Sequence, residues 1–317
     1  MATMTGSGTE ALRAQMDAFT GWHTRKSFDW DAFPASRGFP ELARAQMRYI
    51  GAGGSPKADD PNTLRPGQFT LSLVHQPPGK YGASHAHEIE EAFLVLEGVL
   101  TVGWEWDGEV VEAKFGPRDM ILHAPNRPHG FRNDGVEPVL VSIQVASATP
   151  RPPAYSYHPR NVDPALAAAL GARPGHTEPL RFDSDDPRHR EMARHVVRYS
   201  QQRPGWHPAG FARLVYIGEG GAPPQHYRED LIHLPEGRGV HAYERPVEDA
   251  YLVLRGVLTV GWEENGATVE QRLGPKDLIF NPPGRAHYFR NDGLEPTQFM
   301  MVVGTPNPED VRFQPRA

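Results

Sequence analysis

Two histidines and a glutamate stand close together in a stretch bounded by glycines, residues 79–98. His85 and His87 are one residue apart. On an extended strand alternate side chains point to the same face, so both imidazoles can enter one space. Glu91 follows with the same parity, although an intervening turn could reset it, and His129 offers a further imidazole downstream. Divalent transition metals accept neutral imidazoles together with a carboxylate, so this pattern predicts a metal site.

The stretch resembles the first motif of the cupin superfamily, G-x5-H-x-H-x3-E-x6-G, at every position. Residues 116–133 are similar to the second motif and keep its glycine, its histidine and the asparagine four residues later. Where the family usually has Pro-x-Gly before that histidine, this chain has Ala-Pro-Asn126, and Asn tolerates the left-handed backbone that Gly would otherwise supply. The resemblance implies a small antiparallel β-barrel with a metal held by His85, His87, Glu91 and His129.

The chain contains an internal duplication. Residues 98–138 align without gaps on residues 256–296, a shift of 158, and 25 of the 41 positions are identical. Residues 41–49 also share several identities with residues 191–199, which suggests that the duplication extends upstream. We therefore expect two tandem barrels in four segments: an N-terminal helix and arm (1–40), a first domain (41–148), a linker with a second arm (149–186) and a second domain (187–317).

The second half lacks the complete metal motif. Aligned without gaps, it places Tyr243, Arg245 and Asp249 at the positions of the two histidines and the glutamate, and a compensated two-residue shift would instead match His241 to the first histidine. In both alignments the second imidazole of the motif is lost, while His287 keeps its place. Because Arg245 would repel a cation, we expect a degenerate site. His241, Asp249 and His287 could still hold a metal weakly, and Tyr243 and Arg245 could bind a carboxylate or plug the barrel.

The remaining pattern is typical of an all-β chain. Alternating or continuous apolar runs predict strands near 69–74, 92–96, 100–106, 109–115, 119–123, 128–133 and 137–146, with a hairpin turn at Asp107-Gly108. Helical spacing predicts short helices over 9–19, 40–49 and 163–171. The expected fold is two tandem cupin-type (double-stranded β-helix or jelly-roll) barrels with short helices in the N-terminal arm and the linker. His123, whose counterpart is Asn281, is a candidate acid–base residue beside the site.

Composition narrows the class of partner. The 317 residues carry a net charge of −6 without a basic block, so neither nucleic acid nor an anionic membrane is an expected partner. No apolar run is long enough to span a bilayer, and residues 1–8 show no secretory signal. There is no cysteine, which excludes disulfides and thiolate ligands. We expect a cytoplasmic protein that acts on a small molecule and could form a homodimer by exchanging its arms, residues 20–40 and 175–185.

The resemblance implies several functions. Bicupins with three histidines and one glutamate include C–C-cleaving dioxygenases, oxalate decarboxylases and isomerases. Gentisate-type dioxygenases lack the glutamate, and oxalate decarboxylases match less well because they carry a full ligand set in both halves. The leading hypothesis is an Fe(II) dioxygenase acting on a small, oxygen-rich organic acid or enol in the first barrel, with O2 as co-substrate and Glu91 able to accept a proton. Mn(II), Ni(II), Cu(II) and Zn(II) also suit these ligands. The alternatives are a redox-neutral isomerase, decarboxylase or lyase, and a non-catalytic small-molecule-binding protein.

Overall fold

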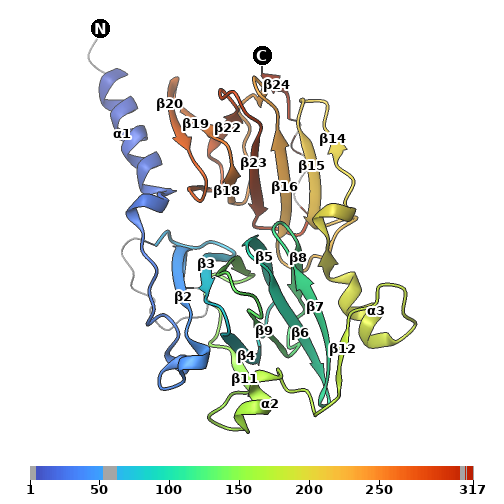
Figure 1. The fold of residues 1–317 in the computed structure, drawn as a ribbon. Helices are drawn as coiled ribbons and strands as arrows, with labels where there is room; N and C mark the ends of the chain where they lie inside the picture. Colours follow the sequence, from blue (N-terminus) through green and yellow to red (C-terminus); the bar gives the residue numbers. More distant parts are fainter. Residues whose placement is uncertain (1–4, 53–62, 308–310, 312, 317) are drawn as a thin grey trace. The chain divides into compact units, whose positions relative to one another are not determined.

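The computed structural model describes residues 5–52, 63–307, 311 and 313–316 (Figure 1). The chain divides into two compact units. The first barrel, as we name one unit, comprises Phe28–Gln202 with Gly221–Pro223, and the second barrel comprises Met1–Ser27, Arg203–Gly220 and Pro224–Ala317. Among the described residues, 5–27 fall in the second barrel and 187–202 in the first, whereas the predicted segments follow the order of the chain. Residues 1–4 of the predicted arm, and 308–310, 312 and 317 of the predicted second domain, lie outside the described residues.

Two six-stranded sheets build the first barrel, in the orders β13-β8-β5-β10-β3-β2 and β11-β4-β9-β6-β7-β12. Strand β12 runs parallel to β7, and the other described pairs are antiparallel. Phe93 from one sheet and Trp104 from the other belong to one buried cluster, so the sheets pack face to face. The strands are β2 Ala45–Ile50, β3 Thr70–Gln76, β4 Tyr81–Ala86, β5 Glu91–Glu97, β6 Leu100–Trp106, β7 Glu109–Phe115, β8 Met120–His123, β9 His129–Arg132, β10 Val139–Val145, β11 Ala154–Tyr157, β12 Thr177–Pro179 and β13 Val196–Val197.

The second barrel repeats this plan with sheets of seven and five strands, in the orders β1-β21-β18-β23-β16-β15-β14 and β20-β19-β22-β17-β24. Its core joins Tyr251 of one sheet to Trp262 of the other. The predicted all-β fold with two cupin-type barrels is confirmed. The strands are β1 Thr20–Gly21, β14 Gly205–Trp206, β15 Ala212–Ile217, β16 Arg228–Leu234, β17 Gly239–Val240, β18 Asp249–Arg255, β19 Leu258–Glu264, β20 Ala267–Leu273, β21 Leu278–Asn281, β22 Ala286–Arg290, β23 Thr297–Val303 and β24 Pro315–Arg316.

Short helices flank the strands. The described helices are α1 Thr5–Ala18, α2 Pro164–Ala168 and α3 Pro187–Arg194, with 3-10 turns η1 His23–Arg25, η2 Pro34–Ser36, η3 Pro40–Leu42 and η4 Tyr199–Gln201. Helix α2 begins as predicted, since the Asp163 side chain accepts a hydrogen bond from the Ala165 backbone N–H. The helix predicted over residues 40–49 is wrong. One 3-10 turn is followed by β2, which is buried along its whole length and pairs with β3, so sheet pairing overrides the local helical spacing.

The duplicated segments adopt the same backbone. Both hairpin turns have two consecutive residues with positive φ, Asp107-Gly108 (50° and 84°) and Asn265-Gly266 (51° and 78°), as a type I′ turn requires. Asn126 has a φ of 59° where its counterpart Gly284 has 72°, so the expectation that Asn would preserve this turn is confirmed.

The structure does not align residues 41–49 with residues 191–199, although their sequence similarity suggested it. Strand β13 pairs with β8, and β1 pairs with the equivalent strand β21. This register makes Thr20 the counterpart of Val196, so the segment that ends at residue 199 corresponds to residues near 20 and not to residues 41–49. The expected upstream alignment is therefore wrong. Within the second barrel, α1 lies against β20.

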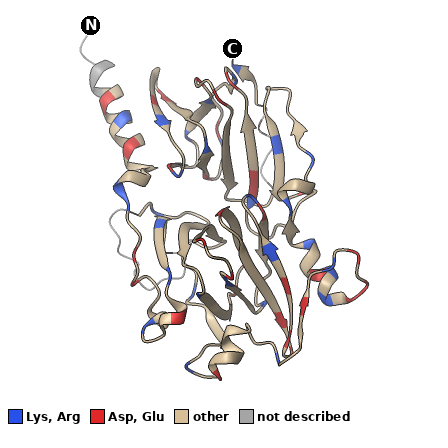
Figure 2. Cartoon of the chain, viewed as in Figure 1, with Lys and Arg blue, Asp and Glu red and all other residues tan. Residues whose placement is uncertain are grey.

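Basic and acidic residues are interspersed along the strands and loops of the chain, as Figure 2 shows. Among the residues that the structure describes, no helix is long and apolar enough to cross a membrane.

Candidate metal centre in the first barrel

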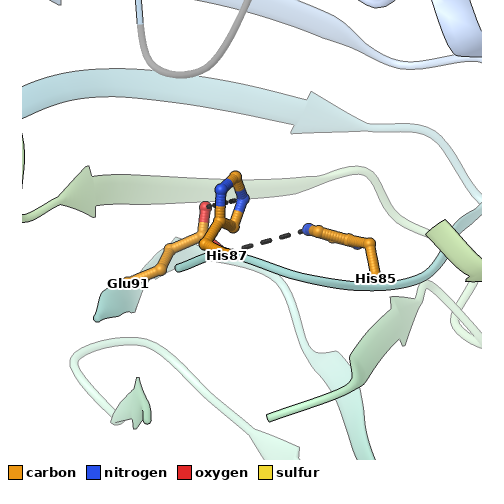
Figure 3. A group of neighbouring side chains, drawn as sticks. All are labelled: His85, His87 and Glu91. Carbon is orange, nitrogen blue, oxygen red and sulfur yellow. Dashed lines mark ion pairs between the residues drawn. The ribbon is translucent and has the colours of Figure 1, made fainter. Parts of the chain in front are cut away.

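The two strands β4 and β5 bring the motif residues together. His85 lies near the end of β4, His87 follows that strand, and Glu91 opens β5. Figure 3 shows both imidazoles beside the glutamate carboxylate. His85 Nε2 lies 3.9 Å from Glu91 Oε2, and His87 Nε2 lies 3.6 Å from Glu91 Oε1. All three residues are buried, and their ligand atoms lie within 4.8 Å of one another. The predicted strand parity and turn thus aim three side chains at one point.

The fourth predicted ligand joins this group through the carboxylate. His129 opens β9 and stands opposite His85 in the β4–β9 register. Its Nε2 lies 3.0 Å from Glu91 Oε2, and the side chain is buried. The structure therefore brings together all four side chains that the first half was expected to contribute, in one carboxylate-centred cluster.

Backbone carbonyls fix which imidazole nitrogen of His85 and of His129 faces the carboxylate. Nδ1 of His85 donates to the Ala83 carbonyl at 2.8 Å, and Nδ1 of His129 donates to the Arg127 carbonyl at 2.9 Å. With Nδ1 protonated in each neutral ring, Nε2 presents a lone pair towards Glu91. Two acceptors at hydrogen-bond distance need a proton or a cation between them. Metal-ligating histidines are held by such second hydrogen bonds, so the residues fit a divalent metal.

The protonation states also suit metal ligands. Burial acts to raise the pKa of Glu91, but the imidazoles of His87 and His129 outweigh it and lower the pKa to about 2. Burial, with the neighbouring His129 and His87, lowers the pKa of His85 well below its usual value. At neutral pH the cluster therefore offers an ionised carboxylate and a neutral His85 imidazole, the forms in which these groups bind metals.

His123 lies directly behind this cluster. It pairs with Glu91 across β5 and β8, and its ring stacks on that of His129, with centroids 3.7 Å apart and an interplanar angle of 8°. Trp104 Nε1 donates to His123 Nδ1 at 2.8 Å. Burial, with the charges of His129 and His85, lowers the pKa of His123 well below its usual value. These contacts show how His123 supports His129, and its acid–base role stays a prediction.

A cavity of about 200 Å³ opens beside the cluster. Three predicted ligands line it, together with mostly apolar side chains of the barrel, and further lining comes from residues 32–35 and from 152, 153 and 155. The lining residues are Ala32, Phe33, Pro34, Ala35, Arg44, Gln46, Val74, His85, His87, Glu91, Phe93, Phe131, Ile143, Pro152, Pro153 and Tyr155.

Sequence reasoning missed one charged residue of this cavity. Arg44 immediately precedes β2 and is 5% exposed, with its guanidinium carbon 4.0 Å from the centre of the Phe33 ring. Burial lowers the pKa of Arg44, while the Tyr155 hydroxyl and the Glu91 carboxylate act to raise it. The residue fell inside the segment that was expected to be helical, and no motif marks it. Arg44 could be recognised as a cavity residue only if residues 45–50 were first predicted as strand β2.

The equivalent position in the second barrel is closed. Tyr243 forms a bridge with His287 just as His85 pairs with His129, so the gapless alignment holds and Arg245 occupies the position of His87. The Asp249 carboxylate receives hydrogen bonds from Arg245 Nε at 3.0 Å and from Asn281 Nδ2 at 2.8 Å, and His287 Nε2 lies 3.2 Å away. The guanidinium of Arg245 thus supplies the counter-charge of the buried Asp249 carboxylate.

The second candidate metal set does not come together as a triad. Asp249 and His287 are buried neighbours, whereas His241 is exposed and its backbone N–H bonds to Gln314. Within the described ranges, the cluster of His85, His87 and Glu91 is the only group of three or more potential ligands with metal-binding proximity.

Comparisons with known proteins agree with the duplicated fold. The cupin domain family matches residues 72–145 and again residues 230–303. The oxalate decarboxylase of Bacillus subtilis is 13% identical over 84% of this chain and 74% of that chain, with a TM-score of 0.60. The Lactobacillus farciminis oxalate decarboxylase in a formate complex is 14% identical over 92% of this chain and 88% of that chain, with a TM-score of 0.63. Comparison with curated proteins gave no match. At these identities the structural likeness concerns the fold.

Proposed function

We propose that this chain, which belongs to the cupin superfamily and carries two cupin domains in tandem, is a metal-dependent enzyme that acts in its first barrel. The observation that carries the proposal is the convergence of three imidazole Nε2 atoms on one buried, ionised carboxylate beside a cavity. His85, His87, Glu91 and His129 would hold the metal, of which we favour Fe(II) over Mn(II), Ni(II), Cu(II) and Zn(II). When bound, such a metal supplies Lewis acidity or a redox relay.

The leading reaction is oxygenation of a small organic acid or enol with O2. The three-histidine, one-glutamate set resembles that of bicupin dioxygenases, and the cavity beside it has apolar walls that include Phe93 and Phe131. His85 and His129 keep their orientation through the carbonyls of Ala83 and Arg127. Because the pKa of Glu91 is about 2, its carboxylate is ionised at neutral pH, which is the form that binds a metal and can accept a proton.

A redox-neutral reaction is the second candidate, and the oxalate decarboxylases among similar structures favour it. Decarboxylation, isomerisation or lysis of a carbonyl acid would use the same ligands, with Glu91 or His123 moving a proton. The closed second barrel separates this chain from a protein with two equivalent metal sites.

Oxygen dependence separates the two candidates. The Fe(II)-loaded full chain is incubated with a panel of small hydroxy, keto and aromatic acids, and substrate loss is followed by mass spectrometry in air and in an anaerobic chamber. We expect turnover with matched O2 uptake in air and none without O2. Unaltered anaerobic turnover would exclude the dioxygenase and support the redox-neutral reaction. Glu91→Gln should be inactive, and His176→Ala, which changes an exposed histidine, should retain full activity.

A further inference from the structure

Arg44 is a buried cation that the fold leaves without an acidic partner. Its residue is 5% exposed, and within the described ranges no carboxylate lies at ion-pair distance from its guanidinium. The nearest charge that affects it is Glu91 of the metal cluster, which acts through space. Burial of an unpaired charge is unfavourable, so a group that remains buried in this state is expected to meet an anion.

The guanidinium is held in one orientation. The Phe33 ring covers it at 4.0 Å and the Phe131 ring lies 5.7 Å away. Nη1 donates to the Leu42 carbonyl at 3.2 Å and to Ser36 Oγ at 3.3 Å. A guanidinium has five N–H donors in a planar fork, so these two bonds leave further donors for the cavity that Arg44 lines.

Tyr155 connects Arg44 to the metal cluster. It lines the same cavity, and its hydroxyl stabilises the charged form of Arg44. Its ring lies 5.6 Å from that of His85, which it faces across the β11–β4 pair. A small molecule in this cavity can therefore meet the guanidinium, the phenol and the metal ligands together.

The second barrel provides an internal control for this charge. Ala45 pairs with His75, and Ala212 pairs with His233, which is the counterpart of His75, so the residue before each strand is Arg44 in one barrel and Phe211 in the other. Phe211 is buried, with its ring 5.9 Å from Phe289. The same scaffold therefore packs with an apolar side chain, and the charge of Arg44 is not required by the fold.

We propose that Arg44, assisted by Tyr155, binds the carboxylate of the substrate while the rest of the molecule reaches His85, His87 and Glu91. This rests on the proposed function, because it assigns the substrate class of the same site. Arg44 is the only Lys or Arg among the described lining residues, and the other walls are mainly apolar. The preferred substrate class is therefore a small acid with a single carboxylate for Arg44.

The test compares an acid with its neutral amide. Calorimetric titrations of the metal-free full chain use two pairs of probes, benzoate with benzamide and the smaller propionate with propionamide. Because a charged hydrogen-bond pair is lost with the amide, we expect at least one acid to bind about tenfold more tightly than its amide. The ratio should fall to about one in Arg44→Met and decrease less in Tyr155→Phe. Arg37→Met, which removes an exposed arginine of the same segment, should leave it unchanged.

If Arg44→Met does not fold, the ratio of acid affinity to amide affinity in the unmodified protein still tests the proposal. Equal binding of acid and amide in both pairs, or no binding of any probe, would overturn the proposal. So would an acid preference that survives in folded Arg44→Met. Arg44→Lys retains the charge without the planar fork and should give an intermediate ratio. These titrations need neither a metal nor turnover. If the chain prefers the acid but binds no metal in a separate assay, the carboxylate site stands and only the proposed metal-dependent function is contradicted.

Discussion

The two barrels place a buried carboxylate against an imidazole in the same way and supply its counter-charge differently. In the first barrel Glu91 faces three imidazoles, with no guanidinium within ion-pair distance among the described residues. In the second barrel Arg245, which stands where the first has His87, donates to Asp249 directly. A buried carboxylate needs a positive partner, and these barrels offer it either a metal site or a fixed side chain. Replacement of two imidazoles by tyrosine and arginine thus preserves the scaffold and changes the counter-charge of the carboxylate.

The supporting contacts around the two positions are nearly identical. Trp104 donates to His123, and Trp262 donates to Asn281, each at 2.8 Å. Asn133 and Asn291 cap equivalent turns through the same kind of backbone contacts. Features shared by both barrels therefore belong to the scaffold, and Arg245 and Phe211 are positions at which the second barrel differs from the first.

The largest expected effect on stability comes from breaking the fixed counter-charge. Arg245→Ala leaves the buried Asp249 without its cation, and we expect it to lower the free energy of unfolding by about 3–5 kcal/mol in urea denaturation. At the equivalent position of the metal-free first barrel, His87→Ala should cost much less. Arg255→Ala, at an exposed position, serves as the control. Equal losses for Arg245→Ala and His87→Ala would contradict the comparison.

The free energy of unfolding should depend on pH through Glu229, which stands where the first barrel has Leu71. Burial, with Asp230 beside it, raises the pKa of Glu229 from 4.5 to about 8. Between these values the folded chain binds more protons than the unfolded chain, so the free energy of unfolding falls as the pH rises from about 4.5 to about 8.

Glu229→Gln should remove this contribution and become more stable than the unmodified chain by roughly 2–4 kcal/mol above pH 8, with little difference below pH 4.5. Denaturation curves at several pH values measure the effect. A constant difference across the whole pH range would show that Glu229 does not titrate as its burial implies.

The smallest expected effect on stability comes from giving the first barrel the second barrel's residue behind the site. His123→Asn keeps an acceptor for Trp104 but loses the ring that stacks on His129, so we expect a loss of about 1 kcal/mol and retained metal binding. Activity then separates two roles. A fall of about a hundredfold or more would indicate proton transfer by His123, and a small change would indicate packing.

Much of this organisation could be predicted from the sequence, because it depends on local residue patterns. The motif spacing, the duplication and the two positive-φ hairpins identify the fold, and Asn126 marks a turn that the structure retains. The gapless alignment of Arg245 with His87 was one of two alternatives, and strand pairing selects it.

What could not be predicted depends on pairing between distant segments. The spacing of residues 40–49 fits a helix equally well, and only their pairing with β3 makes them a strand and places Arg44 in the cavity. Tertiary contacts likewise determine that β1 pairs with β21 and that β13 pairs with β8. Homodimer formation through the arms and a cytoplasmic location stay predictions.

The most direct test of the account is the metal content of the full chain purified without oxygen or chelator, measured by mass spectrometry for the unmodified protein, His87→Ala and the exposed-histidine control His176→Ala. We predict about one transition metal per chain in the unmodified protein and the control, and none in His87→Ala, because the second barrel already holds its counter-charge in Arg245. Two metals per chain, or one that persists in His87→Ala, would contradict the distinction between the barrels.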